Sequence, residues 1–465
     1  MKKTKIVATI SDRKCDVEFL TKLYNSGVNV VRLNTAHQSL DDAIRVVKNV
    51  RTVSENIAIL IDTKGPEVRT VNIETPLHVE KGDIVFMAGD LSVKKDNIIY
   101  ASYKEFVDYL QVGQRVLIDD GDIELIVNSN DGTCLEMIAN NQGIIKNKKS
   151  INVPGVKMNL TSLSGKDIDF IKFAIDNKID FIAHSFVRSK EDVLGIQRML
   201  DAHNSDAKII AKIENQEGVD NIDEILDHVY GVMVARGDLA IEIEMGYIPR
   251  IQRHIVNKCI ESKKPVIIAT QMLHTMIDHP RPTRAEISDI ANAVFSGTDA
   301  IMLSGETAYG DYPVEAVEFM AKVATLNEST TPIDTNRNLV RINNETTAAI
   351  ARVAVRMTTM LDIKAIVVDT FSGRTARYLS AFRAGIPVYA MCSDKRIMRE
   401  LSLSYGIEAL YSENSGSRTE FIEHIPGVLS SRGFKPEDQV LVIGGNYNTS
   451  LGASFLEVLR VGEVK

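Results

Sequence analysis

Residues 209–215 read Ile-Ile-Ala-Lys-Ile-Glu-Asn, an apolar run that a lysine and a carboxylate interrupt two positions apart. The first residues of this run are typical of a fully buried strand. Because side chains alternate between the two faces of a strand, Lys212 and Glu214 leave the same face, a cation beside an anion. Taken alone, such a pair is most often a structural ion pair or a strand end that enters solvent.

The next apolar run changes this interpretation. Residues 231–235 read Gly-Val-Met-Val-Ala and end just before Arg236-Gly237-Asp238. If two neighbouring parallel strands end at the same level, Glu214 and Asp238 converge with Lys212 between them. Two facing carboxylates suit Mg²⁺, which takes oxygen ligands and leaves positions open for a substrate phosphate. A nearby ammonium group would then balance charge on a phosphoryl group or an enolate oxygen.

Length and composition restrict the class of protein. A chain of 465 residues is too long for one hydrophobic core, so we expect roughly two to four domains. With 44% apolar and 25% charged residues the sequence is typical of a soluble globular protein, and its net charge of −8 argues against nucleic acid as a partner. The scattered cysteines fit reduced thiols, and no apolar run approaches the about 18 residues of a membrane helix. We expect a cytoplasmic protein that does not bind membranes.

Short runs rich in valine, isoleucine and alanine recur along the chain, and helical patterns follow them. The eight predicted strands are residues 5–10, 28–34, 57–64, 181–186, 209–215, 231–235, 265–272 and 300–306. Helical patterns between them include residues 16–25, 40–51, 166–177, 190–202 and 247–262. Eight strand–helix units with buried parallel strands predict an α/β fold built on a (β/α)8 TIM barrel.

Polar residues gather at the C-terminal ends of these predicted strands, where barrels of this kind carry their active sites. They are Arg32, Asn34, Asp62, Lys64, Ser185, Lys212, Glu214, Asp238, Thr270, Gln271, Ser304 and Glu306. Helix caps and solvated turns do not explain all of them together. We therefore predict an active site at this end of the barrel.

Two further domains accompany the predicted barrel, which takes residues 1–66 and 155–335. Residues 67–154 change to period-two runs and turn residues, with Asn130-Asp131-Gly132 as a hairpin signal, and predict a small inserted β-barrel that stands over the active face as a lid. After a polar linker at residues 332–338, apolar runs at 365–369, 387–391 and 439–443 predict a C-terminal open α/β domain over residues 336–465.

A hydroxyl-rich turn follows the first predicted strand of the C-terminal domain. Residues 370–376 read Thr-Phe-Ser-Gly-Arg-Thr-Ala and open a predicted helix. Free backbone N–H groups and hydroxyls at a helix start form an anion site, whereas an ordinary N-cap explains the same residues equally well.

The residues quoted above, with their neighbours, resemble the pyruvate kinase family in the same order along nearly the whole chain. The matching motifs are residues 3–10 (KTKIVATI), 29–34 (NVVRLN), 62–70 (DTKGPEVRT), 212–215 (KIEN), 233–239 (MVARGDL), 269–273 (ATQML), 280–286 (PRPTRAE) and 301–307 (IMLSGET). Together they are highly specific. The resemblance implies phosphoryl transfer from phosphoenolpyruvate to ADP, which yields pyruvate and ATP.

The resemblance also implies roles for the residues at the predicted catalytic centre. Glu214 and Asp238 would hold Mg²⁺ or Mn²⁺, and Lys212 would stabilise the phosphoryl group in transfer and the enolate left behind. Backbone N–H groups of Gly237 and Asp238, with Thr270, would receive the substrate carboxylate. Thr270 also stands where the family protonates the enolate carbon.

Other residues would bind the phosphoryl group, the nucleotide and a monovalent cation. Arg32 would reach the phosphoryl group, and the nucleotide site would consist of Asn34, His37, Arg69 and Lys149. The K⁺ ligands would be Asn34, Asp62 and the carbonyl of Thr63. A serine usually supplies a fourth K⁺ ligand where this chain has Ala36, whereas Glu67 resembles the residue of potassium-requiring members.

Regulation and assembly follow from the same resemblance. The turn after residue 369 is similar to the effector phosphate loop of the family, which implies that Thr370, Ser372, Gly373, Arg374 and Thr375 bind a phosphorylated effector. Its usual partner segment is not recognisable in residues 444–452. The family implies a homotetramer.

Two alternatives keep part of this interpretation. A Mg²⁺-dependent lyase or aldolase acting on pyruvate enolates would use the same lysine and carboxylates, but it would not need the nucleotide-side residues Arg69 and Lys149. A catalytically weak protein that senses metabolites through its C-terminal domain would not need Lys212, Glu214, Asp238 and Thr270.

Overall fold

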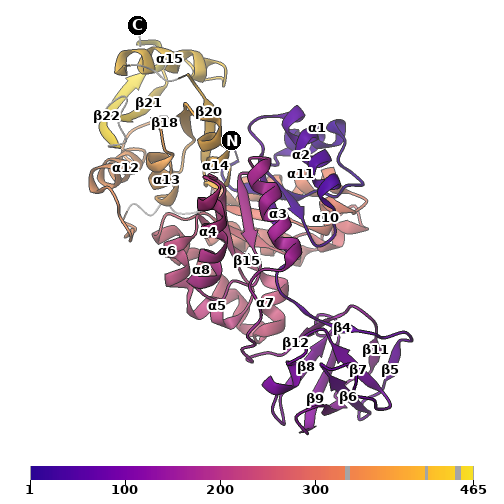
Figure 1. The fold of residues 1–465 in the computed structure, drawn as a ribbon. Helices are drawn as coiled ribbons and strands as arrows, with labels where there is room; N and C mark the ends of the chain where they lie inside the picture. Colours follow the sequence, from indigo (N-terminus) through magenta and orange to yellow (C-terminus); the bar gives the residue numbers. More distant parts are fainter. Residues whose placement is uncertain (1, 330–335, 414–416, 446–451, 464–465) are drawn as a thin grey trace.

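The computed structural model describes residues 2–329, 336–413, 417–445 and 452–463. At its centre is a closed barrel of parallel strands in the order β1-β17-β16-β15-β14-β13-β3-β2 (Figure 1). The strands are β1 (Lys5–Thr9), β2 (Val30–Asn34), β3 (Ala58–Asp62), β13 (Phe181–His184), β14 (Lys208–Ile213), β15 (Gly231–Ala235), β16 (Val266–Ala269) and β17 (Ala300–Leu303). All eight predicted strands are confirmed, although several end before the polar residues that follow them.

Helices surround this barrel. Five of them confirm helices that the sequence predicts: α1 (Val17–Ser26), α2 (Leu40–Val53), α3 (Gly165–Asp176), α4 (Lys190–Ala202) and α8 (Ile248–Glu261). The other described helices of the barrel are α5 (Gln216–Asp220), α6 (Ile222–His228), α7 (Arg236–Glu242), α9 (Arg284–Phe295), α10 (Gly305–Ala308) and α11 (Pro313–Glu328). Reciprocal capping boxes fix the starts of α2, α3 and α9 through Ser39 with Asp42, Ser164 with Asp167, and Thr283 with Glu286.

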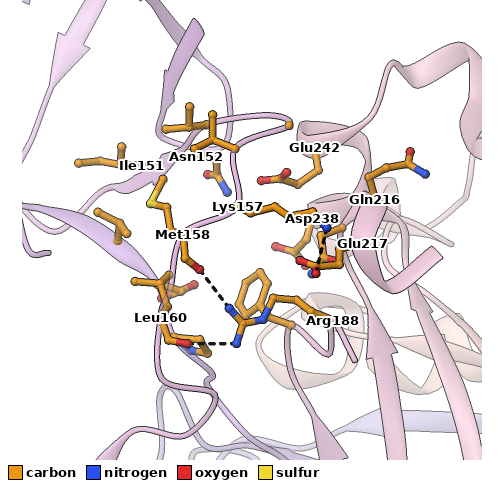
Figure 2. Close-up of a pocket in the computed structure, with 18 of the residues that line it drawn as sticks. Ile151, Asn152, Lys157, Met158, Leu160, Arg188, Gln216, Glu217, Asp238 and Glu242 are labelled. Carbon is orange, nitrogen blue, oxygen red and sulfur yellow. Dashed lines mark hydrogen bonds and ion pairs between the residues drawn. The ribbon is translucent and has the colours of Figure 1, made fainter. Parts of the chain in front are cut away.

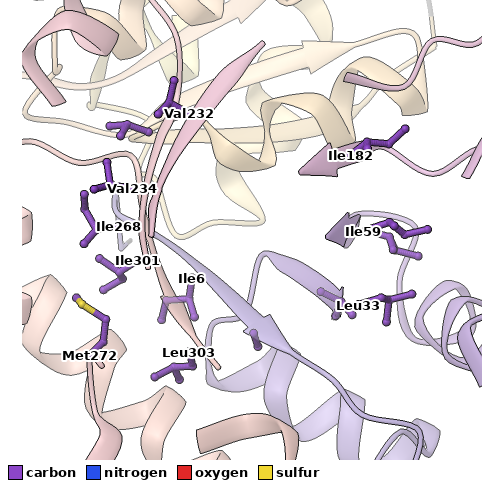
Figure 3. Close-up of a cluster of buried hydrophobic side chains, with 14 of the residues drawn as sticks. Ile6, Leu33, Ile59, Ile182, Val232, Val234, Ile268, Met272, Ile301 and Leu303 are labelled. Carbon is purple, nitrogen blue, oxygen red and sulfur yellow. The ribbon is translucent and has the colours of Figure 1, made fainter. Parts of the chain in front are cut away.

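Two apolar layers form because side chains alternate along each barrel strand. Ile6, Ile59 and Ile268 belong to the layer between strands and helices, part of which Figure 3 shows. Their sequence neighbours Val7 and Leu60 belong to a separate cluster that fills the barrel interior. A strand buried on both faces therefore needs apolar residues at successive positions, which is why the barrel strands are continuous apolar runs.

The inserted segment folds as a second closed barrel between β3 and α3, as predicted. Its strands are β4 (Val68–Val71), β6 (Ile84–Ala88), β7 (Ile98–Ala101), β8 (Arg115–Ile118), β9 (Ile123–Asn130), β10 (Leu135–Ala139) and β12 (Ser150–Asn152), with a separate pair β5 (Leu77–Val79) and β11 (Gly143–Ile145). The expected hairpin at residues 130–132 joins the antiparallel strands β9 and β10. Alternating burial along β9 and β10 supplies the small core of this barrel.

The C-terminal domain is an open sheet in the order β20-β19-β18-β21-β22. Its strands are β18 (Ile363–Asp369), β19 (Val388–Cys392), β20 (Ile407–Tyr411), β21 (Gln439–Gly445) and β22 (Ala453–Arg460), with helices α12 (Glu345–Met357), α13 (Arg374–Ala381), α14 (Lys395–Glu400) and α15 (Arg418–Ser430). The three predicted strands are confirmed as β18, β19 and β21. The antiparallel edge strand β22 was not predicted, because its half-exposed residues do not form an apolar run. Most of the predicted linker, and most of residues 444–452, lie outside the described residues.

The C-terminal domain closes the end of the barrel that lies opposite the inserted domain (Figure 1). Leu403, in a short 3₁₀ turn (Leu401–Leu403), is fully buried and joins the cluster inside the barrel. Arg383 forms a two-fold ion pair with Asp299, which directly precedes β17. Arg399 pairs with Asp180, which directly precedes β13, at 2.6 Å. These contacts fix the domain against the N-terminal ends of the barrel strands. In the described part of the chain no helix is long and apolar enough to span a bilayer.

Candidate active site

Alternation along the strands decides which polar side chains meet in the barrel. Arg32, Asp62 and Lys212 each stand two residues after a side chain that fills the barrel interior, so all three point inward. Arg32 Nε donates to Asp62 Oδ2 at 2.6 Å, and Lys212 Nζ lies 3.1 Å from Asp62 Oδ1. The interior positions of β2, β3 and β14 thus form one buried charged layer above the apolar interior.

Lys212 is the central member of this layer. Its ammonium lies 2.9 Å from Glu214 Oε1 and donates to Ser185 Oγ at 2.7 Å. Burial disfavours the ammonium form, but Asp62, Glu214 and Asp238 outweigh burial and raise the pKa of Lys212. The prediction that Lys212 and Glu214 share a face is correct, and the face is the barrel interior.

Glu214 and Asp238 converge as the two apolar runs predicted. Glu214 follows the last residue of β14, is 1% exposed, and accepts the Phe186 backbone N–H at 2.6 Å. Asp238 lies in the first turn of α7, which starts directly after β15, and its carboxyl group hydrogen-bonds with that of Glu214. Burial raises the pKa of both carboxyl groups, and in Glu214 the adjacent Asp238 raises it further.

These two carboxyl groups fit a divalent cation. Neighbouring buried carboxylates repel each other, and a cation between them removes that repulsion. Among the described residues there is no group of three or more histidine, cysteine, aspartate or glutamate side chains suited to a metal ion. Mg²⁺ commonly takes one or two protein carboxylates as ligands and keeps its other coordination positions open for a substrate phosphate.

Thr270 stands beside this pair at the end of β16. Its Oγ1 accepts the Gly237 backbone N–H at 2.8 Å and donates to the Ala269 carbonyl at 2.6 Å. Thr270 and Gln271 both have positive φ, of 72° and 54°, conformations that cost energy for residues other than glycine. Such strain is typical of functional sites. A substrate carboxylate would replace the Thr270 hydroxyl as acceptor for Gly237.

Several side chains that the motifs did not single out support these groups. Arg236 donates to the Thr270 carbonyl at 2.6 Å and pairs with Asp289 at 2.7 Å, which holds the strained turn in place. Ser185 donates to the Thr63 carbonyl at 2.6 Å while it accepts from Lys212. Ser185 was recognised only as a strand-end polar residue, and Arg236 only as part of a motif.

The predicted K⁺ ligands lie at the ends of two adjacent strands. Asn34 of β2 is paired in register with Asp62 of β3, and Thr63 follows directly. Asn34 Oδ1 accepts the Ala36 backbone N–H at 3.2 Å. The Asp62 carboxylate already contacts Arg32 and Lys212, which lower its pKa although burial alone would raise it.

The predicted nucleotide-side residues lie on two domains. His37 is exposed in the turn after β2. In the inserted domain, Arg69 pairs with Glu67 at 2.7 Å and Lys149 with Asp119 at 2.7 Å. A bound nucleotide phosphate would therefore have to replace Glu67 and Asp119 as the partner of these two cationic side chains.

A cavity of about 220 Å³ separates the inserted domain from the barrel and reaches Asp238 (Figure 2). Asn152, at the end of β12, and Glu242, at the end of α7, both line it, one from each domain. Burial, together with the charge of Asp238, raises the pKa of Glu242 to about 7. Glu242 is a site residue that the sequence did not reveal, because it belongs to no polar strand end.

We expect Glu242→Gln to stabilise the protein above neutral pH. A carboxyl group with a folded pKa near 7 and an ordinary pKa of 4.5 destabilises the fold as pH rises through that window, and the full effect remains above it. The variant should gain about 1–3 kcal/mol of unfolding free energy at pH 8 and progressively less towards pH 5. Urea unfolding across this range measures the gain. Glu217→Gln, in the same cavity wall, is the control, and equal pH profiles for both variants would contradict the assignment.

The predicted effector loop joins β18 to α13. Thr370 and Thr375 are each 5% exposed, and the Ser372 carbonyl accepts from Arg377 at 3.2 Å. Gly373, with φ of 72°, is the N-cap of α13, and no side chain caps this helix start. Arg374 is also among the residues that line a cavity against the barrel.

Comparison with known proteins matches this fold and site to one family. A family profile described as "Pyruvate kinase, barrel domain" matches residues 1–317, and one described as "Pyruvate kinase, alpha/beta domain" matches residues 348–459. The pyruvate kinase of Borreliella burgdorferi is 48% identical, over 99% of this chain and 98% of that protein. The pyruvate kinases of Bacillus licheniformis and Geobacillus stearothermophilus are each 41% identical, over 100% and 96% of this chain and 81% and 78% of those proteins.

Proposed function

This chain belongs to the pyruvate kinase family, and we propose that Lys212, Glu214 and Asp238 form its catalytic centre. The reaction transfers the phosphoryl group of phosphoenolpyruvate to ADP and is the last step of glycolysis. The observation that carries the proposal is the convergence of one buried ammonium and two buried carboxyl groups at the end of β14 and the start of α7. Such a centre supplies what a loose phosphoryl transfer needs, which is positioning and charge stabilisation.

Lys212 acts as a fixed positive charge. Because its pKa is raised, it stays an ammonium ion at neutral pH and does not serve as a base or an amine nucleophile. It stabilises the phosphoryl oxygens during transfer and the enolate oxygen that remains. An enzyme that forms a Schiff base needs a lysine with a lowered pKa, so this property argues against a Schiff-base mechanism at Lys212. The Mg²⁺-dependent lyase or aldolase is distinguished instead by having no need of the nucleotide-side residues Arg69 and Lys149.

Arg32, Gly237 and Thr270 position the substrate around this charge. Arg32 is held by Asp62 and by the Thr9 hydroxyl, at 2.9 Å, and binds the phosphoryl group. The Gly237 and Asp238 N–H groups, with Thr270, receive the carboxylate of phosphoenolpyruvate. Once the bond between phosphorus and the bridging oxygen has broken, Thr270 delivers a proton to the enolate carbon through water, which completes pyruvate.

Enzymes of this family depend on Mg²⁺ and K⁺. Glu214 and Asp238 would hold the divalent ion, Mg²⁺ or Mn²⁺, which when bound adds positive charge beside the phosphoryl and enolate oxygens. Asn34, Asp62 and the Thr63 carbonyl would hold K⁺. With Ala36 in place of the usual serine, this set lacks one side-chain oxygen, which a water molecule would replace.

Loss of either carboxylate should weaken divalent metal binding at least about tenfold, because a single buried carboxylate leaves half of the charge of the ion unbalanced. Mn²⁺ binding, measured by electron paramagnetic resonance without substrate, is compared for the parent, Glu214→Gln and Asp238→Asn. Glu217→Gln, a carboxylate in the same cavity wall, is the matched control. Unchanged Mn²⁺ affinity in both site variants would remove these residues from the metal site.

The nucleotide site is proposed to form when the inserted domain, residues 67–154, closes on the barrel, residues 1–66 and 155–335. Asn34 and His37 would approach the nucleotide from the barrel, and Arg69 and Lys149 from the inserted domain. The cavity between the two domains supports this proposal, because it leaves room for the inserted domain to move towards the barrel. Residues 336–465 would act as the regulatory domain.

The loop made by Thr370, Ser372, Gly373, Arg374 and Thr375 is proposed to bind a phosphorylated effector. The uncapped start of α13 supports this assignment, because its N–H groups face the loop. Replacing Ser372 and Thr375 with aspartate should abolish activation by a phosphorylated sugar, since added negative charge repels phosphate. Activation curves that match the parent would reject the loop as the effector site.

Cytoplasmic location and assembly into homotetramers belong to the same proposal. All four cysteines are free and buried, which suits a reducing compartment. The tetramer rests on family resemblance, and sedimentation velocity would determine it.

A further inference from the structure

Two connectors join the inserted domain to the barrel, and one barrel loop contacts both of them. This loop consists of residues 185–188, between β13 and α4. The outgoing connector passes the loop at Gly65, which has φ of 72°, and a β-carbon at this position would lie 2.8 Å from the Phe186 ring. The return connector, residues 153–163, is hydrogen-bonded to the loop. The loop is therefore placed to influence how the inserted domain is oriented.

Arg188 makes the contacts with the return connector (Figure 2). Its Nη1 donates to the Met158 carbonyl at 3.2 Å, and its Nη2 donates to the Leu160 carbonyl at 3.0 Å. The side chains of Met158 and Leu160 pack against the core of the inserted domain, whereas Leu163 packs against the barrel core. The two hydrogen bonds of Arg188 therefore cross from the barrel to residues that pack with the inserted domain.

The guanidinium group of Arg188 is itself held by the barrel. Asp192, in the first turn of α4 and 8% exposed, accepts from Arg188 Nε at 3.3 Å, from Nη2 at 3.2 Å and from the backbone N–H at 2.9 Å. Asn221 donates to the Arg188 carbonyl at 2.8 Å. We call Arg188 and Asp192 the connector clamp. Because a carboxylate fixes one edge of the planar guanidinium group, the N–H groups that face the connector have fixed directions.

The return connector depends on such contacts because it has little regular structure of its own. Residues 156–163 form neither helix nor strand. Small changes in the backbone dihedral angles of a connector become large displacements of the domain that it carries. Hydrogen bonds to two of its carbonyl groups restrict these angles, so the connector clamp narrows the range of orientations that the inserted domain can take.

The same loop also holds two groups of the proposed catalytic centre. The Phe186 backbone N–H donates to Glu214 at 2.6 Å, and Ser185 Oγ accepts from Lys212 at 2.7 Å. Phe186 has φ of 54°, a conformation that costs energy for a bulky residue. One short segment thus contacts both the catalytic centre and the connectors of the inserted domain.

We propose that Arg188 is a positioning residue that sets the orientation of the inserted domain, and with it the placement of Arg69 and Lys149. This inference rests on the nucleotide site proposed above between the two domains. Arg188 acts through the connector and not on the reacting atoms. A restricted orientation lowers the entropic cost of bringing Arg69 and Lys149 to the nucleotide phosphates. A merely structural ion pair with Asp192 would stabilise α4 and leave nucleotide binding unchanged.

Steady-state kinetics of Arg188→Met separates these two roles. The KM for ADP should rise at least about fivefold, because fewer molecules hold the inserted domain in the productive orientation. Affinity for phosphoenolpyruvate with Mg²⁺ and without nucleotide, measured by isothermal titration calorimetry, should stay within about twofold, since the proposed ligands of this substrate belong to the barrel. Arg188→Lys keeps the charge opposite Asp192 but lacks the planar fork, so it should recover only part of the loss.

Arg51→Met is the matched control. Arg51 pairs with Asp180 at 2.8 Å and donates to the Ile57 carbonyl at 2.5 Å, and its side chain is 22% exposed, against 24% for Arg188. Asp180 directly precedes β13, so these contacts lie at the end of the barrel opposite the inserted domain. Arg51→Met removes an equally buried ion pair and should keep the KM for ADP within about twofold.

A distance measurement without substrate tests the connector clamp independently of the nucleotide site. Spin labels on Ser92→Cys in the inserted domain and Lys48→Cys in α2, both at exposed positions, report the distance between the two domains by double electron–electron resonance. The four native cysteines are buried and therefore protected from labelling. The distance distribution should be broader with Arg188→Met than in the labelled parent or with Arg51→Met.

Three results would overturn the inference. The first is a distance distribution that Arg188→Met does not broaden. The second is a KM for ADP that rises in Arg69→Met but not in Arg188→Met. The third is a loss of phosphoenolpyruvate affinity well beyond twofold in Arg188→Met, which would place its effect in the catalytic centre. An unchanged KM for ADP in Arg69→Met would instead reject the proposed nucleotide site, on which the inference rests.

Discussion

Lys212→Met should lower kcat by at least about 10³-fold, because it removes a charge preorganised at the point where negative charge develops. Methionine keeps most of the length of the side chain but cannot replace the ammonium group that lies 2.9 Å from Glu214 and 3.1 Å from Asp62. Binding of phosphoenolpyruvate in the ground state should change much less, since Arg32 and the N–H groups near Asp238 remain. The loss should therefore appear in kcat more than in KM.

Pyruvate release from phosphoenolpyruvate, with and without ADP, is the measurement for the parent and Lys212→Met. The parent should release pyruvate only with ADP, and release without ADP would favour the lyase alternative. Lys258→Met removes a lysine from the outer face of α8 and should leave kcat within about twofold. Circular dichroism of Lys212→Met distinguishes lost catalysis from lost folding. A kcat within tenfold of the parent in a folded variant would refute the assigned role.

Arg383→Met should destabilise the chain by about 3–5 kcal/mol, because it leaves a buried carboxylate without its counter-ion. Asp299 would keep only the backbone N–H groups of Tyr405 and Val266, each at 3.1 Å. The ion pair joins the C-terminal domain to the start of β17, so the interface between domains should open first. Urea unfolding followed by circular dichroism gives the free energy, and hydrogen exchange in α13 shows where the opening occurs.

Arg460→Met is the control for this prediction. Arg460 pairs with Glu463 at 3.1 Å, but the two side chains are 53% and 68% exposed, so the pair should contribute at most about 1 kcal/mol. If Arg383→Met costs no more than Arg460→Met, burial of the Arg383–Asp299 pair does not govern the stability of the interface.

Much of the candidate site could be predicted from local sequence. The spacing of Lys212 and Glu214 specifies one face of a strand, and the apolar runs specify that the strand is buried on both sides. Asp238 follows the next run closely, so its approach to Glu214 depends only on parallel neighbours that end at one level. Each inference uses a contact between segments close together in sequence or between consecutive strands, where backbone geometry leaves few arrangements.

Other members of the site needed the fold. Ser185 contacts Lys212 and the Thr63 carbonyl, and Thr63 is separated from it by the whole inserted domain. Glu242 has a raised pKa because it is buried in a cavity that the inserted domain, through residues such as Asn152, helps to line. The connector clamp likewise joins the barrel to residues that pack with the inserted domain. No period or motif encodes these pairings.

The sequence by itself determined the barrel, the inserted and C-terminal domains, and the direction in which the central lysine and carboxylate point, because strand and helix periodicity are local properties of the chain. Only the tertiary structure decided how deeply each charge is buried, which partner it meets and therefore which way its pKa moves. Burial and long-range pairing depend on segments that the chain brings together from hundreds of residues apart, and electrostatic energies depend steeply on those distances and on the exclusion of water.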